Sequence, residues 1–314
     1  MVQVSTIIPA YNAESTIVEA LDSVLSQTFQ NHEVVVVNDG SNDSTAAILA
    51  GYGNRIRVIY QTNGGVAKAR NAGVAASSGK YVAFLDADDM WLPGKLTAMV
   101  AALEQNPQAS LAFSDYVIID GHAAECGSSF HNMIHVQRLA REPFLVFSLG
   151  ILPSAWVIPR AIFERTDGFL EQLELFKGPG GYLDQWMLLL LRELGEFVYV
   201  PEKLSVYRAP ESQESADKYA PNLAIFIALA KRHYGRKSRA LIRMARNKQC
   251  KSLLSKVAHQ MDNGDRLGAV CSLARIAGTR PAYFFSSEFT ERLFLPHNIK
   301  RARSLAAVLN RTHE

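Results

Sequence analysis

The chain has 314 residues, of which 48% are hydrophobic and 20% are charged, and its formal net charge is +3. This composition excludes a disordered or collagen-like chain, and the length exceeds what one average core needs, so we expect two domains. The sequence contains no apolar run long enough to span a membrane and no secretory leader, and its three cysteines are scattered. These features predict a cytoplasmic protein without a disulfide framework.

The first 120 residues alternate between strand and helix patterns. Short apolar runs predict strands, and apolar residues at helical spacing predict the helices between them. The predicted strands are 4–9, 32–37, 55–60, 81–85 and 110–119, and the predicted helices are 17–29, 44–49, 66–76 and 93–104. Apolar strands that alternate with helices form parallel sheets covered on both faces, so we predict an α/β fold with a mostly parallel sheet flanked by helices.

Beyond residue 120 the pattern changes. Residues 121–180 are irregular, and a glycine-rich loop signal at 178–181 precedes a helix at 187–194 and strands at 197–200 and 204–207. From residue 220 onward the sequence predicts helices alone, at 223–234, 238–261, 266–277 and 287–293.

The charge changes sign near residue 220. Residues 1–219 carry 15 Lys and Arg against 25 Asp and Glu, whereas residues 220–314 carry 18 against 5. Such a change is a boundary signal. We therefore predict one domain over 1–219, with a nucleotide-binding half at 1–120 and a catalytic half at 121–219, and a basic helical region over 220–314.

Three carboxylates follow the predicted strand at 81–85. Asp86, Asp88 and Asp89 would repel one another there unless a cation joins them, and a hard divalent ion that also binds phosphate oxygens suits such ligands. The ordinary alternative is a solvated turn before the next helix. Ligands of parallel sheets bind at the carboxyl ends of the strands, which is where Tyr11 and Asp39 also lie.

Four motifs stand in order over about residues 3–92, each at a strand end or a helix start. They are Ile7–Asn12, Val37–Ser41, Asn63–Gly73 and Phe84–Asp89. Together they resemble the family 2 glycosyltransferases of the GT-A fold. The sequence has neither a dinucleotide-binding G-x-G-x-x-G motif after the first strand nor a P-loop before a helix. The resemblance implies an inverting enzyme that transfers a sugar from a nucleoside-diphosphate sugar to an acceptor hydroxyl.

The resemblance also implies a donor site. Tyr11 would lie against a nucleobase, and Asp39 would accept a hydrogen bond from its imide N–H, which favours uracil. Asp88, together with Asp86, would hold Mn²⁺ or Mg²⁺ against the diphosphate. The implied nucleotide-sugar contacts are Pro9, Tyr11, Asp39, Arg70, Asp86 and Ala87. Ordinary alternatives are an Asx turn at Asp39 and packing at Tyr11.

By the same resemblance, Asp184 would be the base that takes the proton of the acceptor hydroxyl. Its apolar neighbours in the sequence predict a raised pKa through desolvation, and a helix cap is the alternative role. The family commonly has Glu where this chain has Leu183, and often His where it has Pro210. These departures leave open a nucleotide-sugar-binding protein with impaired catalysis. A sugar nucleotidyltransferase, which uses a related sheet, is a further alternative.

The basic region mixes cationic and apolar residues. The cations are Arg232, Arg236, Lys237, Arg239, Arg243, Arg246, Lys248 and Lys251, and Leu241, Met244, Leu253 and Leu254 lie between them. A basic helix with an apolar stripe can lie on an anionic membrane surface, here the inner face. The alternatives are a solvated helix face and an oligomer interface. Nucleic-acid binding is not expected, because no recognition motif accompanies the charge. A glycan or lipid-linked glycan acceptor, in polysaccharide or glycoconjugate synthesis, would suit such a location.

Overall fold

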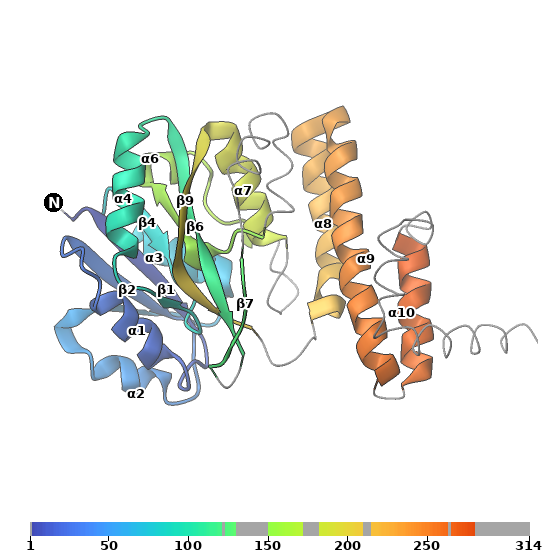
Figure 1. Cartoon of the computed structure of the whole chain (residues 1–314), viewed down its shortest axis with the longest axis horizontal. Helices are drawn as coiled ribbons and strands as arrows, with labels where there is room; N and C mark the ends of the chain where they lie inside the picture. Colours follow the sequence, from blue (N-terminus) through green and yellow to red (C-terminus); the bar gives the residue numbers. More distant parts are fainter. Residues whose placement is uncertain are drawn as a thin grey trace, which may run out of the picture. The chain divides into compact units, whose positions relative to one another are not determined.

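The computed structural model describes residues 2–120, 123–129, 150–171, 182–209, 215–262 and 265–279. The chain divides into two compact units: unit 1 comprises residues 1–177 and 182–211, and unit 2 comprises 178–181 and 212–314. The boundary predicted at residues 219/220 falls inside helix α8 (Ser215–Tyr234). Figure 1 shows a sheet with flanking helices in unit 1 and helices in unit 2.

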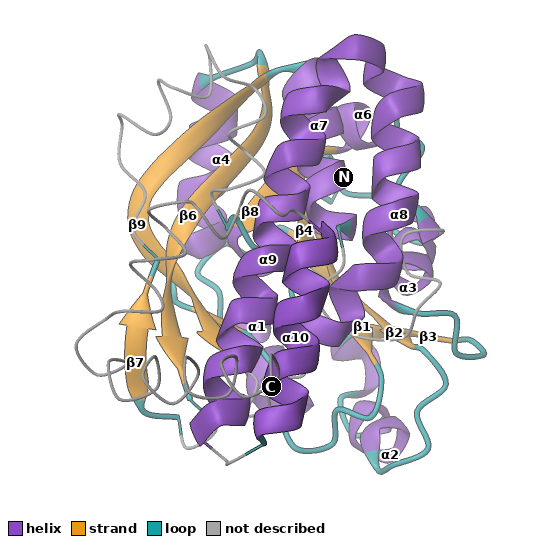
Figure 2. Ribbon diagram, turned by 90° about the vertical axis from the view of Figure 1, so that its right-hand side faces the viewer, coloured by secondary structure: helices purple, strands orange, loops and turns teal. Residues whose placement is uncertain are grey.

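The described part of unit 1 contains one nine-stranded sheet (Figures 1 and 2). Four strands pair in parallel in the order β3-β2-β1-β4, and their bounds are β1 Val4–Ala10, β2 His32–Asn38, β3 Arg57–Tyr60 and β4 Tyr81–Phe84. These strands are rich in valine, isoleucine and aromatic residues, which suit a buried sheet.

The second half of the sheet is mixed. Strand β8 (Trp156–Pro159) runs antiparallel to both β4 and β6 (Ala109–Ile119), and β6 pairs in parallel with β9 (Glu196–Arg208). The short strands β5 (Met90–Trp91) and β7 (Glu125–Ser128) pair antiparallel with β9 and β6. The α/β prediction is confirmed. The strands predicted at 197–200 and 204–207 are one strand, β9, whose register against β6 shifts near Asp115. An irregular register lets a long strand bend without ending.

Helices cover both faces of the sheet. Residues of α1 (Ile17–Leu25), α2 (Thr45–Ala50) and α4 (Lys95–Gln105) share one hydrophobic cluster with one face of β1 and β2. On the other face, α3 (Val66–Ala75) contacts β1 and β2, and α6 (Arg160–Phe163) packs its Phe163 ring 5.9 Å from the ring of Phe84. Helix α7 (Leu183–Leu194) contacts α6 and β6. The helices predicted in this region are confirmed, with ends that differ by a few residues.

Helix α3 is fixed closely against the sheet. A Cβ atom at Gly73 would lie 2.4 Å from Cγ2 of Ile7 on β1, so glycine permits an approach that a larger residue would prevent. At the start of the helix, Gly65 has φ +90°, a conformation that other residues rarely adopt. Both ends of α3 therefore have defined positions relative to the strands.

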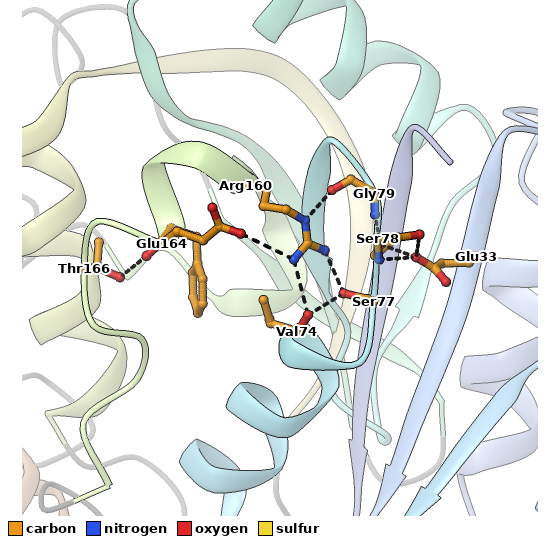
Figure 3. A network of polar contacts seen from close by, with 10 residues as sticks. Glu33, Val74, Ser77, Ser78, Gly79, Arg160, Glu164 and Thr166 are labelled. Atoms are coloured by element: carbon orange, nitrogen blue, oxygen red, sulfur yellow. Dashed lines mark hydrogen bonds and ion pairs between the residues drawn. The ribbon is translucent and has the colours of Figure 1, made fainter. Parts of the chain in front are cut away.

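The turn between α3 and β4 is held by Arg160 (Figure 3). Its Nε donates to Gly79 O at 2.6 Å, one Nη donates to Val74 O at 3.2 Å, and the other donates to Ser77 Oγ at 2.7 Å. A carboxylate oxygen of Glu33 accepts hydrogen bonds from the same turn. Arg160 and Glu33 thus hold the turn that follows α3 from two sides by hydrogen bonds to its backbone and serine side chains.

Unit 2 consists, in its described part, of helices packed side by side (Figure 1). Helices α8, α9 (Ser238–Asp262) and α10 (Arg266–Thr279) follow one another, with the short 3₁₀ helix η5 (Gly235–Lys237) between α8 and α9. A buried cluster joins α9 to α10 through Cys250, Leu253, Leu254, Val257, Ala269, Leu273 and Ile276. The three helices predicted here are confirmed. The helix predicted at 287–293 and the loop at 178–181 lie outside the described residues.

Candidate active site

The carboxyl ends of the adjacent strands β2, β1 and β4 carry most of the residues that the sequence indicated. Hydrogen bonds tie the loops together there: Asn12 N donates to Ser41 Oγ at 3.0 Å, and Asn42 N donates to Asn12 Oδ1 at 2.9 Å. Asn12 itself has φ +49°, a left-handed conformation that asparagine tolerates. The loops after β1 and β2 therefore act as one surface at this edge of the sheet.

The Asp39 carboxylate organises the segment that leads into α3. Its Oδ1 accepts hydrogen bonds from Gln61 Nε2 at 2.7 Å and from Gly64 N at 2.8 Å, and its Oδ2 accepts one from Gly65 N at 2.8 Å. The side chain is 3% exposed. A carboxylate can accept about four hydrogen bonds, so three intramolecular donors leave room for about one further donor from a ligand.

Pro9 and Tyr11 lie on either side of the end of β1. Pro9 is buried within the strand and stands opposite Val37 of β2. Tyr11 follows the strand and is 53% exposed, so its ring is not part of the core. Exposure of a large aromatic ring at the ligand-binding edge of a sheet suits stacking against a flat ligand better than it suits the packing alternative.

Arg70 on α3 joins two carboxylates that are far apart in the sequence. One Nη donates to Asp86 Oδ1 at 2.7 Å, and the other donates to Asp184 Oδ1 at 2.9 Å. The Arg70 side chain is 3% exposed, compared with 31% for Asp86 and 26% for Asp184. Burial lowers the pKa of the guanidinium, but the charges of Asp86 and then Asp184 outweigh it and raise that pKa above its usual value. The bridge brings the two predicted parts of the site into direct contact.

Asp184 lies in the first turn of α7, beside Leu183 and Trp186, which are both buried. This apolar setting matches what the sequence indicated. The hydrogen bond from Arg70 was not foreseen, and it places a cation directly against the Asp184 carboxylate. The contact fixes the Asp184 carboxylate on the same guanidinium that binds Asp86.

Negative charge is concentrated around Asp88. Although part of this residue is exposed, desolvation and then the charge of Asp86 raise the pKa of Asp88 to about 6. Burial, followed by the charges of Asp89 and Asp88, raises the pKa of the nearby Tyr207 phenol to about 12. A region that disfavours additional negative charge in this way favours a bound cation.

Asp89 has a different role from its neighbours. It is 2% exposed; its Oδ2 accepts a hydrogen bond from Ser154 Oγ at 2.5 Å, and its Oδ1 accepts one from Arg208 N at 3.0 Å. Burial and the charges of Asp86 and Asp88 raise its pKa well above the usual range. Asp89 therefore joins the loop after β4 to η3 (Pro153–Ala155) and to the end of β9.

Sequence reasoning missed two residues that shape this loop. Ser154 Oγ accepts from Asp86 N at 3.1 Å, in addition to its bond to Asp89, and no motif marked it. Arg208, at the end of β9, donates from Nε to Asp88 O at 3.2 Å and forms an ion pair with Glu19 on α1. The partners of Arg208 lie in the loop after β4 and on α1, far away in the sequence, and could not be deduced from spacing.

Arg70 also rests on an aromatic ring that the sequence did not indicate. The Phe169 ring centroid lies 5.0 Å from Arg70 Cζ. Asn71, the next residue of α3, holds Phe169 by two hydrogen bonds: Asn71 Nδ2 donates to Phe169 O at 2.8 Å, and Phe169 N donates to Asn71 Oδ1 at 2.9 Å. Asn71 thus fixes the loop that carries Phe169, and the ring of Phe169 in turn supports the guanidinium of Arg70.

The carboxylates offer an incomplete set of metal ligands. Among the residues that the structure describes, no group of three His, Cys, Asp or Glu side chains is arranged to hold a metal ion. Within the same residues, the Asp88 carboxylate accepts no hydrogen bond from another residue, whereas one oxygen of Asp86 is bound to Arg70. One or two carboxylates, with phosphate oxygens and water, are the usual ligands of Mg²⁺ in nucleotide sites. The donor set therefore fits a metal that arrives with a diphosphate.

Comparisons with known proteins show what the chain is similar to. Residues 5–150 match the model of the family "Glycosyl transferase family 2". An uncharacterized glycosyltransferase of Rickettsia prowazekii is 33% identical over 177 residues, which are 54% of each chain. The Escherichia coli protein WfgD, named a UDP-Glc:alpha-D-GlcNAc-diphosphoundecaprenol beta-1,3-glucosyltransferase, is 38% identical over 122 residues, 38% of this chain and 48% of that protein. The chain thus spans about half the length of these relatives.

A solved structure shows the same fold. The S. aureus TarS fragment 1–349, in complex with UDP-GlcNAc, superposes with a TM-score of 0.58 and 20% sequence identity, covering 88% of this chain and 81% of that one. None of the helices in the described part of the present chain has the length and the apolar content that crossing a membrane requires.

Proposed function

The chain belongs to glycosyltransferase family 2, and from this membership we propose that it transfers a sugar from a UDP-sugar to an acceptor hydroxyl, with inversion and with the help of a divalent metal. The observation that carries the proposal is the Arg70 bridge, which places Asp86 of the donor site and Asp184, the proposed base, on one guanidinium. A donor phosphate and an acceptor hydroxyl that bind beside these carboxylates would be close enough to react.

The donor site is proposed at the ends of β1, β2 and β4. Tyr11 would stack on the base, and Asp39 would use its remaining acceptor capacity for the imide N–H. The backbone around Pro9 and Ala87 would line the nucleotide. The UDP and UDP-GlcNAc complexes of TarS support a uridine nucleotide as the donor.

Asp88, assisted by Asp86, would hold Mn²⁺ or Mg²⁺ beside the diphosphate. When bound, the metal would neutralise charge on the departing nucleoside diphosphate. The chain's own residues would do the rest: Arg70 holds Asp86 and Asp184 in place, and Asp184 accepts the proton of the acceptor hydroxyl as the new glycosidic bond forms. A single displacement by that hydroxyl inverts the configuration at the anomeric carbon.

For the acceptor, we propose a glycan carried on a lipid diphosphate, in polysaccharide or glycoconjugate synthesis. The support is the name of WfgD, whose acceptor is a diphosphoundecaprenol-linked sugar.

The decisive experiment compares the wild type with Asp184→Asn. With Mn²⁺ and a set of UDP-sugars, we expect the wild type to transfer or hydrolyse the sugar, and the variant to lose about 10³-fold in rate while it retains donor affinity. Full activity of the variant would remove Asp184 as the base. Donor binding without turnover in the wild type would favour a binding protein, and pyrophosphate release from a sugar phosphate and a nucleoside triphosphate would favour a nucleotidyltransferase.

A further inference from the structure

Unpaired positive charge is concentrated in unit 2 at the turn between α8 and α9. Seven basic side chains there are exposed, and we call them the basic turn: Lys231, Arg232, Arg236, Lys237, Arg239, Arg243 and Arg246. Between Asp217 and Asp262 the sequence contains eleven Lys or Arg residues and no Asp or Glu. Within the part of the chain that the structure describes, none of the seven forms an ion pair.

The charges share a face of α9. Arg239, Arg243 and Arg246 follow one another at helical spacing, so their side chains leave the helix on the same side. Like charges at this spacing destabilise a helix. Placing the three arginines on one side of α9 therefore does not stabilise the described part of the fold. An anion from outside the chain would stabilise this arrangement.

The leucines of α9 are not available to a membrane. Leu241 is fully buried, and Leu253 and Leu254 pack in the cluster that joins α9 to α10. Among the described residues, the exposed large hydrophobic side chains are Tyr11, Val18 and Tyr60, all in unit 1. The leucines of the apolar stripe that the sequence indicated are thus part of the unit's core, Met244 is partly buried, and the exposed side chains of the basic turn are cationic.

We propose that the basic turn docks on an anionic lipid surface through headgroup phosphates, without insertion into the acyl layer. Guanidinium groups match phosphate oxygens in geometry and charge, and basic residues adsorb to anionic leaflets without help from apolar contacts. A single-stranded nucleic acid would need exposed aromatic rings on which its bases could stack, and the described part of unit 2 has no exposed Phe, Tyr or Trp. The inference does not depend on the proposed transferase reaction or its acceptor.

The first test is sedimentation of the full chain with vesicles. We expect binding to vesicles that contain phosphatidylglycerol and none to vesicles of phosphatidylcholine alone. Binding should disappear near 1 M salt, because the screening length falls there from about 8 Å to about 3 Å. Equal binding to both kinds of vesicle, or binding that resists salt, would overturn the proposal. So would tighter binding to duplex or single-stranded DNA than to anionic vesicles at the same ionic strength.

The second test uses matched variants. Each basic residue near an anionic surface contributes about fivefold to binding, so Arg239→Gln with Arg243→Gln should weaken vesicle binding about 25-fold. Arg165→Gln with Lys203→Gln removes the same charge from exposed sites of unit 1 and should change binding by less than about twofold. Thermal melting checks that both pairs fold. Equal losses in the two pairs would show that net charge, not the basic turn, controls adsorption.

Discussion

Two arginines, near opposite ends of the strands of one sheet, both contact helix α3 or its flanking turn, but they bind different kinds of partner. Arg70 lies on α3 near the carboxyl ends of the strands and binds two carboxylates, Asp86 and Asp184. Arg160, near the other ends of the strands, donates to two carbonyl groups and a hydroxyl at the end of α3 (Figure 3). Both are multiply bonded and largely removed from solvent.

The difference lies in the chemistry of the partners. Arg160 donates to two carbonyl groups and a hydroxyl in and just after the last turn of α3, and its acidic neighbour Glu164, 3.9 Å away, is exposed and lies four residues along the chain, so this arginine serves the fold. The partners of Arg70 are acidic side chains, and two carboxylates kept near each other by one cation cost desolvation energy that an apolar substitute would avoid. Charge that folding does not require is the stronger sign of a reactive site, although an ion-pair network alone can also perturb groups in this way.

Among the substitutions that distinguish the role of Arg70 from that of Arg160, Arg70→Lys is expected to have the largest effect. Lysine keeps the charge but lacks the planar fork, so it can reach one carboxylate at a time. We expect kcat/KM for sugar transfer to fall about 10³-fold, as when a preorganised donor is removed from an active site, while the free energy of unfolding falls by only about 2 kcal/mol, the value of one lost charge-assisted hydrogen bond. Steady-state kinetics and urea unfolding measure the two quantities.

Tryptophan fluorescence suits the unfolding measurement, because Trp91, Trp156 and Trp186, the three tryptophans of the chain, all belong to unit 1. An Arg70→Lys variant that transfers sugar at the wild-type rate would place Arg70 with Arg160 as a structural residue.

The converse result is expected for Arg160→Lys. The variant loses the ordered set of bonds to Gly79, Val74 and Ser77 and should be about 2 kcal/mol less stable. Its kcat per folded molecule should remain within about twofold of the wild type. A large loss of kcat at a temperature where the variant is folded would mean that the turn between α3 and β4 also determines the geometry of the active site.

The fold could be predicted from the sequence more completely than the arrangement of the site. Hydrophobic periodicity predicted the strands and helices of unit 1 because each depends on local spacing, and the β1–β4 motifs lie where a parallel sheet must gather them. The position of Arg70 between Asp86 and Asp184 could not be derived, since it needs the register of α7 against α3. Ser154 is a sharper case, because its segment shows no regular pattern in the sequence and it acts through contacts to the loop after β4 and to Trp91 on β5.

Lys95 is a third basic residue to compare, because its amino group has neither a carboxylate nor a carbonyl group as a hydrogen-bond partner among the described residues. Lys95, at the start of α4, is fully buried, and its Nζ has no hydrogen bond among the described residues. Burial lowers the pKa of Lys95 to about 7, whereas an unfolded lysine titrates near 10.4. Between these values the unfolded chain binds more protons, so the free energy of unfolding should rise with pH by about 1.4 kcal/mol per unit.

The measurement compares the wild type with Lys95→Met by urea unfolding at pH 8 and pH 9. The wild type should gain about 1.4 kcal/mol relative to the variant over this interval, and the difference should level off below about pH 7, where both states hold the proton. Because Lys95 is not placed in the site, kcat should change little. A stability difference that does not vary with pH would mean that Lys95 remains charged in the folded protein.

The smallest effect expected concerns Asn71, which positions Phe169 under Arg70. Asn71→Ala removes two hydrogen bonds and frees the ring, so the guanidinium should hold its carboxylates less firmly and kcat should fall about fivefold, equivalent to about 1 kcal/mol. Ser77→Ala is the matched control at the other end of α3, where the hydroxyl also makes two bonds, to Val74 and Arg160. The control should lose a similar amount of stability and no kcat. If both variants lose stability alone, Phe169 is ordinary packing; if Asn71→Ala alone lowers kcat, the cation bridge depends on how the loop is held.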